Sequence, residues 1–254
     1  MGIYRKVNNV LTRRLPVNTV RSRAPRAIAS LTYDDFPKSA WTVAGPIMAK
    51  FGVRATYYVA GRFCGITEDG IEYFDLADLK AVAAAGHEIG CHSYSHGFAS
   101  RTDSGTLLHE IERNAAFLRK HLGDIAIDSY AYPYGDVSPR TKTLLGGAFK
   151  SARGISRRVN TGRVDLAMVH SIVLEHRRWR PDEIEASIAR AKASGGWITF
   201  FTHDVGPAPL DFGVLPERLE WVLQRIAAHG IEVLPVNEAV DLIVNGEPQQ
   251  AAAA

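Results

Sequence analysis

The sequence predicts a single-domain α/β fold, an irregular (β/α) barrel with about seven parallel strands. Two observations lead to this prediction. From residue 27 onward, short apolar runs alternate with amphipathic segments, which is typical of a parallel sheet covered by helices. The 254 residues contain no Gly/Ser-rich linker that would divide them, and their number suits one α/β barrel, which commonly has roughly 200–250 residues.

The expected strands are short runs of β-branched, aromatic and other apolar residues. The strongest signals are Ala55–Ala60 and Trp197–Phe201, in which aromatic and β-branched residues dominate. In chain order, we expect strands at Ala27–Tyr33, Ala55–Ala60, Glu88–Cys91, Ile127–Tyr132, Ser151–Ile155, Val169–Leu174, Trp197–Phe201 and Ile231–Leu234.

The expected helices combine apolar residues at helical spacing with residues that begin or end helices. Asp75–Ala85, for example, starts with an acidic residue and stops before Gly86, while Pro139 and Pro181 suit first turns. In chain order, we expect helices at Lys38–Phe51, Asp75–Ala85, Ser104–His121, Ser138–Leu145, Pro181–Ala193, Leu215–His229 and Asn237–Val244.

Charge divides the chain into a basic extension at 1–26, the barrel at 27–245 and a tail at 246–254. The extension holds seven of the 30 basic residues and no acidic one, so 23 basic residues face 27 acidic ones in the rest. We expect the extension to be solvated, with a weak contact to an anionic surface as the alternative. A mildly acidic body argues against a nucleic-acid partner, which requires clustered basic residues on the folded surface.

Other sequence features bear on compartment and on function class. No run approaches the ~18 apolar residues of a membrane-spanning helix, and the extension lacks the apolar region of a secretory signal. Cys64 and Cys91 form no disulfide framework and no paired metal-thiolate motif. We therefore expect a cytoplasmic protein with buried free thiols. Oligomeric state is not readable from these features.

Polar side chains collect directly after four of the expected strands. In barrels of this kind, catalytic groups lie at the carboxyl ends of strands. These positions hold Asp34 and Asp35, His92 and His96, Pro133–Asp136, and His203 and Asp204. The sequence therefore predicts that these four segments meet at one rim.

Histidines four residues apart can share one face of a helical turn, as His92 and His96 would. Two imidazoles and one carboxylate are a common ligand set for a catalytic metal with an open position for water. The spacing alone is a weak signal in a chain with nine histidines. The adjacent Asp34 and Asp35 strengthen it, because one carboxylate can bind the metal while the other moves a proton.

Four ordered motifs resemble those of the polysaccharide deacetylase family, also called the NodB-homology domain. Leu31–Asp35 (LTYDD) resembles its T-F-D-D motif, and His92–His96 (HSYSH) its H-S/T-x-x-H motif. Tyr130–Gly135 (YAYPYG) resembles the aromatic-R-x-P-Y-G motif, and Thr202–His203 the late L-x-H motif. The resemblance covers about residues 27–240 and excludes the basic extension.

The resemblance implies an irregular (β/α) barrel that hydrolyses N-acetyl, sometimes O-acetyl, groups on sugars with a divalent metal. It implies that Asp35, His92 and His96 bind the metal, which we expect to be Zn²⁺, with Co²⁺, Ni²⁺ and Mn²⁺ as alternatives. Asp34 would be the general base, His203 the general acid, and the backbone N–H of Tyr134 an oxyanion donor. We further expect Tyr94, Tyr132 and Pro133 to contact the sugar.

These roles agree with the demands of amide hydrolysis. A metal polarises the carbonyl and lowers the pKa of bound water towards roughly 7, and a carboxylate such as Asp34 can accept its proton. An oxyanion donor contributes roughly 3–4 kcal/mol. The amine leaves only when protonated, and an imidazole can supply that proton near neutral pH.

The chain departs from the family pattern at two places. The motif-three arginine, which pairs with the base aspartate, is replaced by Ala131, and we hypothesise that Arg153 on the next strand supplies this charge. The D-x-x-D-W motif, whose aspartate tunes the acid histidine, has no clear counterpart. Asp165 and Glu175 are the candidates for that aspartate's role.

The sequence thus indicates a metal-dependent hydrolase that removes an N-acetyl group from a sugar, oligosaccharide or polysaccharide. Two alternatives keep the scaffold and the metal: an O-acetyl esterase, and a hydrolase of another C–N bond such as a cyclic ureide. A third is an inactive carbohydrate-binding relic. In that case the replacement of the motif-three arginine by Ala131 would be the first indication that activity has been lost. Non-haem iron oxidation would use the same ligands but would give His203 no role.

Overall fold

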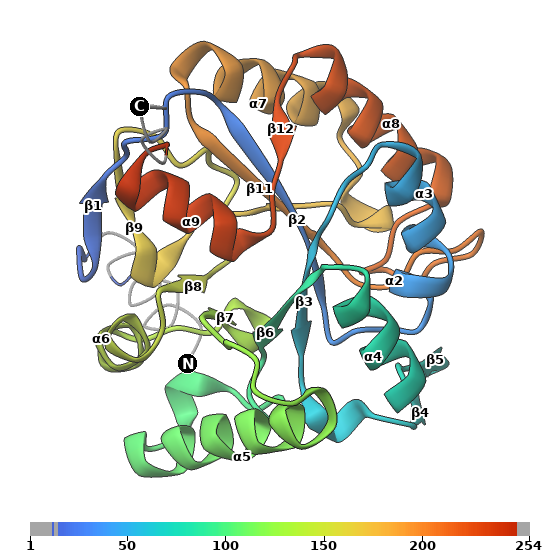
Figure 1. Ribbon diagram of the computed structural model, residues 1–254, viewed down its shortest axis with the longest axis vertical. Coiled ribbons are helices and arrows are strands. Elements are labelled where there is room, and N and C mark those ends of the chain that lie inside the picture. Colours follow the sequence, from blue (N-terminus) through green and yellow to red (C-terminus); the bar gives the residue numbers. More distant parts are fainter. Residues whose placement is uncertain (1–11, 13–14, 248–254) are drawn as a thin grey trace, which may run out of the picture.

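The computed structural model describes residue 12 and residues 15–247 (Figure 1). Strands and helices alternate along most of this length, as expected for a (β/α) fold. The strands are β1 (Thr19–Arg21), β2 (Ile28–Asp34), β3 (Thr56–Val59), β4 (Thr67–Glu68), β5 (Ile71–Glu72), β6 (Glu88–Cys91), β7 (Ser129–Ala131), β8 (Ser151–Arg153), β9 (Arg163–Asp165), β10 (Ile172–Val173), β11 (Trp197–Thr202) and β12 (Glu232–Val233). The α-helices are α2 (Ser39–Thr42), α3 (Ala44–Lys50), α4 (Leu76–Ala84), α5 (Ser104–Leu122), α6 (Pro139–Ala148), α7 (Pro181–Ser194), α8 (Pro216–Ala228) and α9 (Val236–Asn245).

The central sheet is parallel and curls into an irregular barrel, which confirms the predicted fold class. Its strands follow the order β10-β11-β2-β3-β6-β7-β8, and β12 pairs with the start of β2. At the other side of the sheet, β8 meets the segment just before β10 through a parallel bridge between Arg153 and Val169. The backbone N–H of Gly154 donates to the carbonyl of Val169, so hydrogen bonds continue across this join.

Alternation along the strands separates an apolar outer face from a polar interior. In β2, Ala29, Leu31 and Tyr33 belong to the main hydrophobic cluster that packs under the helices. The intervening Thr32 and Asp34 therefore point to the opposite face, because successive strand side chains alternate. Some polar groups inside this barrel find partners within the chain. The hydroxyl of Thr32, for example, donates to the carbonyl of Phe200.

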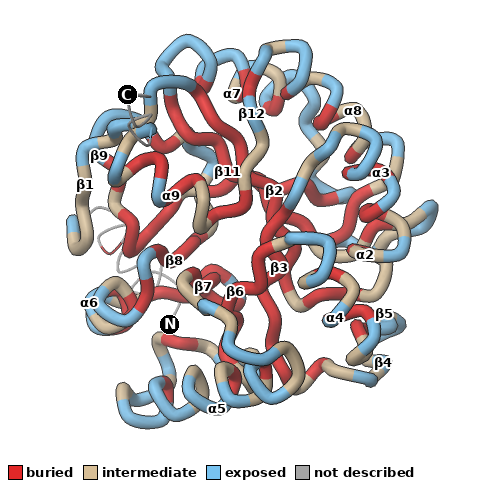
Figure 2. Tube along the Cα trace, viewed as in Figure 1, coloured by how far each residue is buried: buried red, intermediate tan, exposed pale blue. Residues whose placement is uncertain are grey.

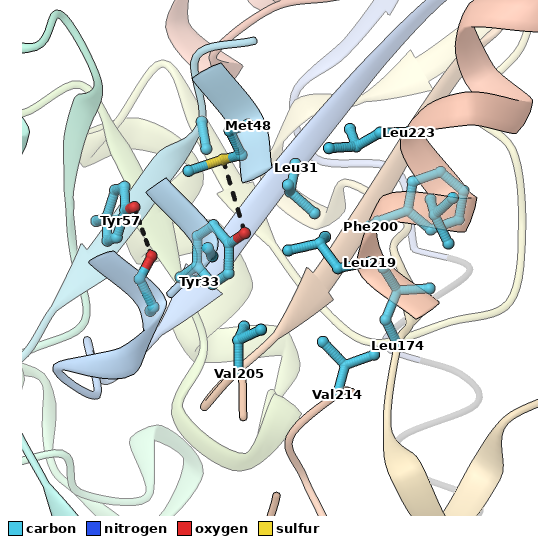
Figure 3. Close-up of a cluster of buried hydrophobic side chains, with 14 of the residues drawn as sticks. Leu31, Tyr33, Met48, Tyr57, Leu174, Phe200, Val205, Val214, Leu219 and Leu223 are labelled. Atoms are coloured by element: carbon cyan, nitrogen blue, oxygen red, sulfur yellow. Dashed lines mark hydrogen bonds between the residues drawn. The ribbon is translucent and has the colours of Figure 1, made fainter. Parts of the chain in front are cut away.

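The seven central strands are buried, while the outer faces of the helices are exposed (Figure 2). Figure 3 shows part of the main cluster, where Leu31 of β2 lies near Leu219 and Leu223 of α8. In the same cluster the hydroxyl of Tyr33 points to the sulfur of Met48 at 3.6 Å. This packing fixes β2, and with it the two aspartates at its carboxyl end.

The expected helix Lys38–Phe51 is interrupted and forms α2 and α3. The break lies at Val43, whose φ of −104° departs from the roughly −63° of a regular helix. Pro46 gives the reason, because it has no N–H to donate to the carbonyl of Thr42 and its ring crowds that carbonyl. The prediction of one continuous helix was therefore wrong at this point.

Part of the expected N-terminal extension packs against the barrel. β1 pairs antiparallel with β9, and the backbone N–H groups of Val17 and Asn18 donate to the carboxylate of Asp165. The fully buried ammonium of Lys142 binds the carbonyls of Thr12 and Leu15 as well as Asp165, at 2.8 Å. These contacts contradict a wholly solvated extension. The expected contact with an anionic surface, and the tail from 248 onward, fall largely on residues outside the described part.

The long helices of the barrel are amphipathic. Among the described residues, no helix is long and apolar enough to cross a bilayer.

The lowered pKa of His87 predicts how the free energy of unfolding depends on pH. Burial and the nearby Arg54 lower the pKa of His87 to about 4, and its Nδ1 accepts the backbone N–H of Ala55 at 2.9 Å. The unfolded chain protonates its histidine near pH 6.5. Between pH 6.5 and 4 the unfolded state therefore binds more protons, and the free energy of unfolding falls as pH decreases.

A His87→Gln variant isolates this effect from other histidines. We expect its free energy of unfolding to fall less steeply than that of wild type, by about 2 kcal/mol at pH 4.5, because one pK unit corresponds to ~1.4 kcal/mol. Denaturant unfolding between pH 7 and 4.5, with chelator in both samples, measures the difference. Parallel curves for the two proteins would contradict the prediction.

Candidate active site

Two consecutive carboxylates leave the end of β2 in different directions. Asp34 is the last residue of the strand and is 4% exposed. Asp35 has a φ of 64° and Phe36 a φ of 58°, so the backbone turns sharply into the left-handed region directly after the strand. This turn separates the partners of the two side chains: Asp34 meets Arg153, and Asp35 meets histidines.

Asp35, His92 and His96 form a compact cluster of possible metal ligands. Oδ1 of Asp35 lies 3.4 Å from Nε2 of His92 and 3.1 Å from Nε2 of His96. The ligand atoms of the three residues all lie within 4.8 Å of one another. Although it is buried, Oδ1 of Asp35 accepts no well-oriented hydrogen bond within the described part of the chain.

The two imidazoles have the protonation state that metal binding requires. Burial lowers the pKa of His92 and of His96 to about 4, so both rings are neutral near pH 7. Nδ1 of His92 lies 2.8 Å from the carbonyl of Ala131, to which it can only donate. Nε2 of His92 therefore keeps its lone pair and directs it towards Asp35.

The backbone between the two histidines is not helical, contrary to the expectation of a helical turn. Ser93 and His96 both have positive φ values, 57° and 53°. The rings nevertheless converge, with centroids 4.9 Å apart. The sequence pattern therefore predicted correctly that His92 and His96 are neighbours, but the helical turn from which this was argued does not form.

These three residues fit a divalent metal. Two neutral nitrogens and one carboxylate oxygen are a common catalytic ligand set, and protein ligands lie about 2.0–2.2 Å from Zn²⁺. A cation between them would also give the buried Oδ1 of Asp35 the partner it lacks. His92, His96 and Asp35 are therefore the residues that would hold such an ion.

Arg153 is the partner of Asp34. One terminal nitrogen of this guanidinium lies 2.6 and 2.5 Å from the two carboxylate oxygens, and Arg153 is 1% exposed. Its charged end lies 4.7 Å from the ring centroid of Phe201. Burial raises the pKa of Asp34, but Arg153, His92 and His203 outweigh it and hold this pKa below its ordinary value. The hypothesis that Arg153 replaces the charge missing at Ala131 therefore has direct geometric support.

His203 follows β11 and reaches the same group. Its Nε2 lies 4.0 Å from Oδ2 of Asp35, and its Nδ1 lies 3.3 Å from the backbone carbonyl of Phe212. This carbonyl occupies the position for which Asp165 and Glu175 were candidates. Asp165 instead holds the N-terminal segment, and Glu175 pairs with Arg177 and Arg178.

A cavity of about 530 Å³ opens over these residues. Asp34, Asp35, His92, His96 and His203 lie together in its lining. Tyr134 is 58% exposed in the same cavity, and its φ of 59° gives it a left-handed backbone. Six of the predicted site residues, Tyr134 included, thus line one cavity although they come from four segments of the chain.

Three other predicted site residues do not line this cavity. Tyr132 is 1% exposed, and its hydroxyl donates to the carbonyl of Ala167, so it belongs to the core. Tyr94 packs on α5, where the guanidinium of Arg113 lies 3.7 Å from its ring centroid. Pro133 is buried at the start of the 3₁₀ turn Pro133–Gly135 and shapes the backbone of that turn. The expectation that these side chains contact the sugar is not supported.

The walls of the cavity include residues that the sequence analysis missed. They come from the 3₁₀ turn Gly61–Phe63, the β4–β5 hairpin with the residue that follows it, the loop before α7 and the loop after His203. These residues include Arg62, Glu68, Tyr73, Arg177, Leu210 and Phe212. The Gly/Pro-rich run after His203 was an available signal, because loops at the carboxyl ends of barrel strands build the site.

Comparison with known proteins agrees with the motifs. Residues 21–147, which are half of the chain, match the family described as polysaccharide deacetylase. A chitin deacetylase from Arthroderma benhamiae is 23% identical over 242 residues, covering 92% of this chain and 56% of that protein. The chain spans only 22% and 56% of the lengths of the two curated relatives that it matches.

Solved structures show the same fold. A peptidoglycan N-acetylglucosamine deacetylase has a TM-score of 0.60 at 17% identity, covering 86% of this chain and 90% of that one. A family 4 acetyl xylan esterase from Clostridium thermocellum, solved with a cobalt ion, has a TM-score of 0.54 at 22% identity, with 85% and 91% covered. The fold, the ordered motifs and the match over half of the sequence lead to one conclusion: this chain belongs to the polysaccharide deacetylase family.

Proposed function

We propose that this protein is a metal-dependent hydrolase that removes an N-acetyl group from a sugar, oligosaccharide or polysaccharide. One observation carries the proposal. A base candidate, three metal-ligand candidates and an acid candidate line the same cavity: Asp34, Asp35, His92, His96 and His203. Such a set suits hydrolysis of an amide, which needs an activated water and a protonated leaving group.

The metal would be held by Asp35, His92 and His96, and Zn²⁺ is the ion that this ligand set favours. When bound, it supplies Lewis acidity that polarises the acetyl carbonyl and makes water a better nucleophile at neutral pH. Co²⁺, Ni²⁺ and Mn²⁺ remain alternatives, since nitrogen and oxygen ligands accept them as well.

Asp34 is proposed as the general base. Its ion pair with Arg153 keeps the carboxylate ionised and fixes its orientation. As water attacks the acetyl carbon, Asp34 accepts a proton from that water. The carbonyl oxygen gains negative charge in this step, and the backbone N–H of Tyr134 is the proposed donor to it.

His203 is proposed as the general acid. Nδ1 faces the carbonyl of Phe212, so Nε2 is the nitrogen directed towards Asp35 and the cavity. When the C–N bond breaks, protonation of the nitrogen by His203 lets it leave as an amine, and the other product is acetate. An amine needs this proton more than an alkoxide does, which favours N-acetyl over O-acetyl substrates. Two similar proteins named above carry names that refer to N-acetylated glycans.

Acetate release tests the proposal directly. We expect metal-loaded protein to release acetate from at least one N-acetylated glycan in a panel of chitin oligomers and peptidoglycan fragments. O-acetylated xylan and a cyclic ureide test the alternatives. Asp34→Asn and His203→Gln should each reduce the rate by about 10²–10⁴-fold, because each removes a proton-transfer group.

A chelator-treated sample and a His109→Gln variant, altered on the exposed face of α5, are the controls. No release from any N-acetylated member by the metal-loaded protein would count against the proposal. Binding to these glycans without turnover would favour an inactive carbohydrate-binding protein instead.

Metal binding is a separate prediction. We expect one divalent ion per chain, and we expect Asp35→Asn, His92→Gln and His96→Gln each to weaken it by at least about 100-fold, more than the 10–100-fold typical of residues that only orient a ligand. Titration calorimetry with Zn²⁺ measures this, and His203→Gln should bind the ion nearly as wild type does. Unchanged affinity in the His96 variant would remove it from the ligand set.

Arg153→Ala tests the ion pair with Asp34. Without the guanidinium, the buried carboxylate loses its orientation, and we expect kcat/KM to fall on the order of 100-fold. Breaking a buried pair also destabilises the fold, by roughly 3–5 kcal/mol. Ala131 and Arg153 are register partners on adjacent parallel strands, so their side chains share a face.

An Ala131→Arg, Arg153→Ala double variant therefore returns a guanidinium to the same side of the sheet. We expect it to recover part of the activity that the single variant loses. Arg157→Ala, which removes an exposed arginine paired with Glu183, is the matched control and should leave the rate unchanged. Full activity in Arg153→Ala would show that the pair does not serve the reaction.

A further inference from the structure

The second ring nitrogen of His96 faces a side chain and not the backbone. Its Nδ1 lies 3.1 Å from the hydroxyl of Tyr134, and the two ring centroids are 4.5 Å apart. The proposed mechanism uses only the backbone N–H of Tyr134. The phenol is therefore a polar group at the site that this mechanism leaves without a role.

The two histidines differ in what their Nδ1 atoms meet. For His92 the partner is the buried carbonyl of Ala131, which can only accept, so the tautomer of His92 is fixed. For His96 the partner is a hydroxyl, which can both donate and accept. His96 can therefore present its Nε2 either with or without a proton, and only the second form can bind a cation.

Tyr134 is well positioned despite its exposure. Its ring stacks on Phe98 with centroids 4.2 Å apart and an interplanar angle of 18°. The guanidinium of Arg101 lies 4.2 Å from the centroid of Phe98. The left-handed backbone of Tyr134, with a φ of 59°, brings the phenol back over His96. A stacked ring on a constrained backbone holds its hydroxyl with little loss of freedom.

We propose that Tyr134 is a positioning residue for His96: its hydroxyl accepts a hydrogen bond from Nδ1 of His96 and so keeps the lone pair of Nε2 directed at the metal position. The inference rests on the proposed metal site. Groups that orient a ligating histidine through its other nitrogen typically contribute 10- to 100-fold in metal affinity. Because the phenol is exposed, water replaces it in part, and the lower end of that range applies.

Tyr134→Phe is the decisive variant, because it keeps the stack on Phe98 and removes only the hydroxyl. We expect its affinity for Zn²⁺, measured by competition with a chromogenic chelator, to fall about 10-fold. We expect the visible absorption of the Co²⁺-loaded variant to differ from wild type, since the geometry of one ligand changes. Tyr134→Ala should be impaired at least as much.

Tyr73→Phe is the matched control. Tyr73 lines the same cavity and stacks on Phe63, but within the described residues its hydroxyl bonds to neither histidine. Its metal affinity and Co²⁺ spectrum should match wild type.

The outcomes separate this inference from the proposed function. If wild type binds no metal, both fail. If wild type binds Zn²⁺ and Tyr134→Phe binds it within twofold, with an unchanged Co²⁺ spectrum, the hydroxyl has no positioning role while the proposed function stands. A defect in Tyr134→Ala alone would assign the effect to ring packing and would also overturn the inference.

Discussion

The site depends on how two adjacent buried carboxylates are each given a partner. Unpaired, a buried carboxylate costs several kcal/mol or takes up a proton. Asp34 is kept ionised by Arg153, whose guanidinium is itself buried beside Phe201. Burial instead raises the pKa of Asp35, whose Oδ1 faces two neutral imidazoles. One carboxylate is thus satisfied within the chain, and the other is left facing the position where a cation fits.

Backbone strain is concentrated at this site. The non-glycine residues with positive φ in the described part of the chain are Asp35, Phe36, Asp69, Ser93, His96 and Tyr134. All but Phe36 and Ser93 line the cavity, and those two adjoin residues that do. Left-handed conformations cost energy in residues with a Cβ, so the surrounding structure must hold them. The core under β2 and the stack of Tyr134 on Phe98 are the parts that do so.

The sequence predicted the barrel, most of its elements and the residues that meet in the cavity. These predictions succeeded because strand and helix periods are local and because strand ends gather at one rim. Tyr132 was expected to contact the sugar because it is an aromatic residue near the rim, but its side chain is buried in the core. The packing of Thr12 and Val17 on Lys142 and Asp165 could not be predicted, since these partners lie about 130 to 150 residues apart. The sequence around His96 also contains no signal that predicts the positive φ of this residue.

The departure at Ala131 shows why a motif is a weaker guide than the position of a charge. Ala131 and Arg153 lie opposite each other on β7 and β8, so a guanidinium from either strand approaches the barrel interior from the same side. What Asp34 requires is a buried cation within hydrogen-bonding distance, and Arg153 provides it at 2.5 Å. The strand that supplies the cation is set by sheet register and not by the motif. Loss of the motif arginine therefore leaves Asp34 paired, because the register partner of Ala131 carries the same charge.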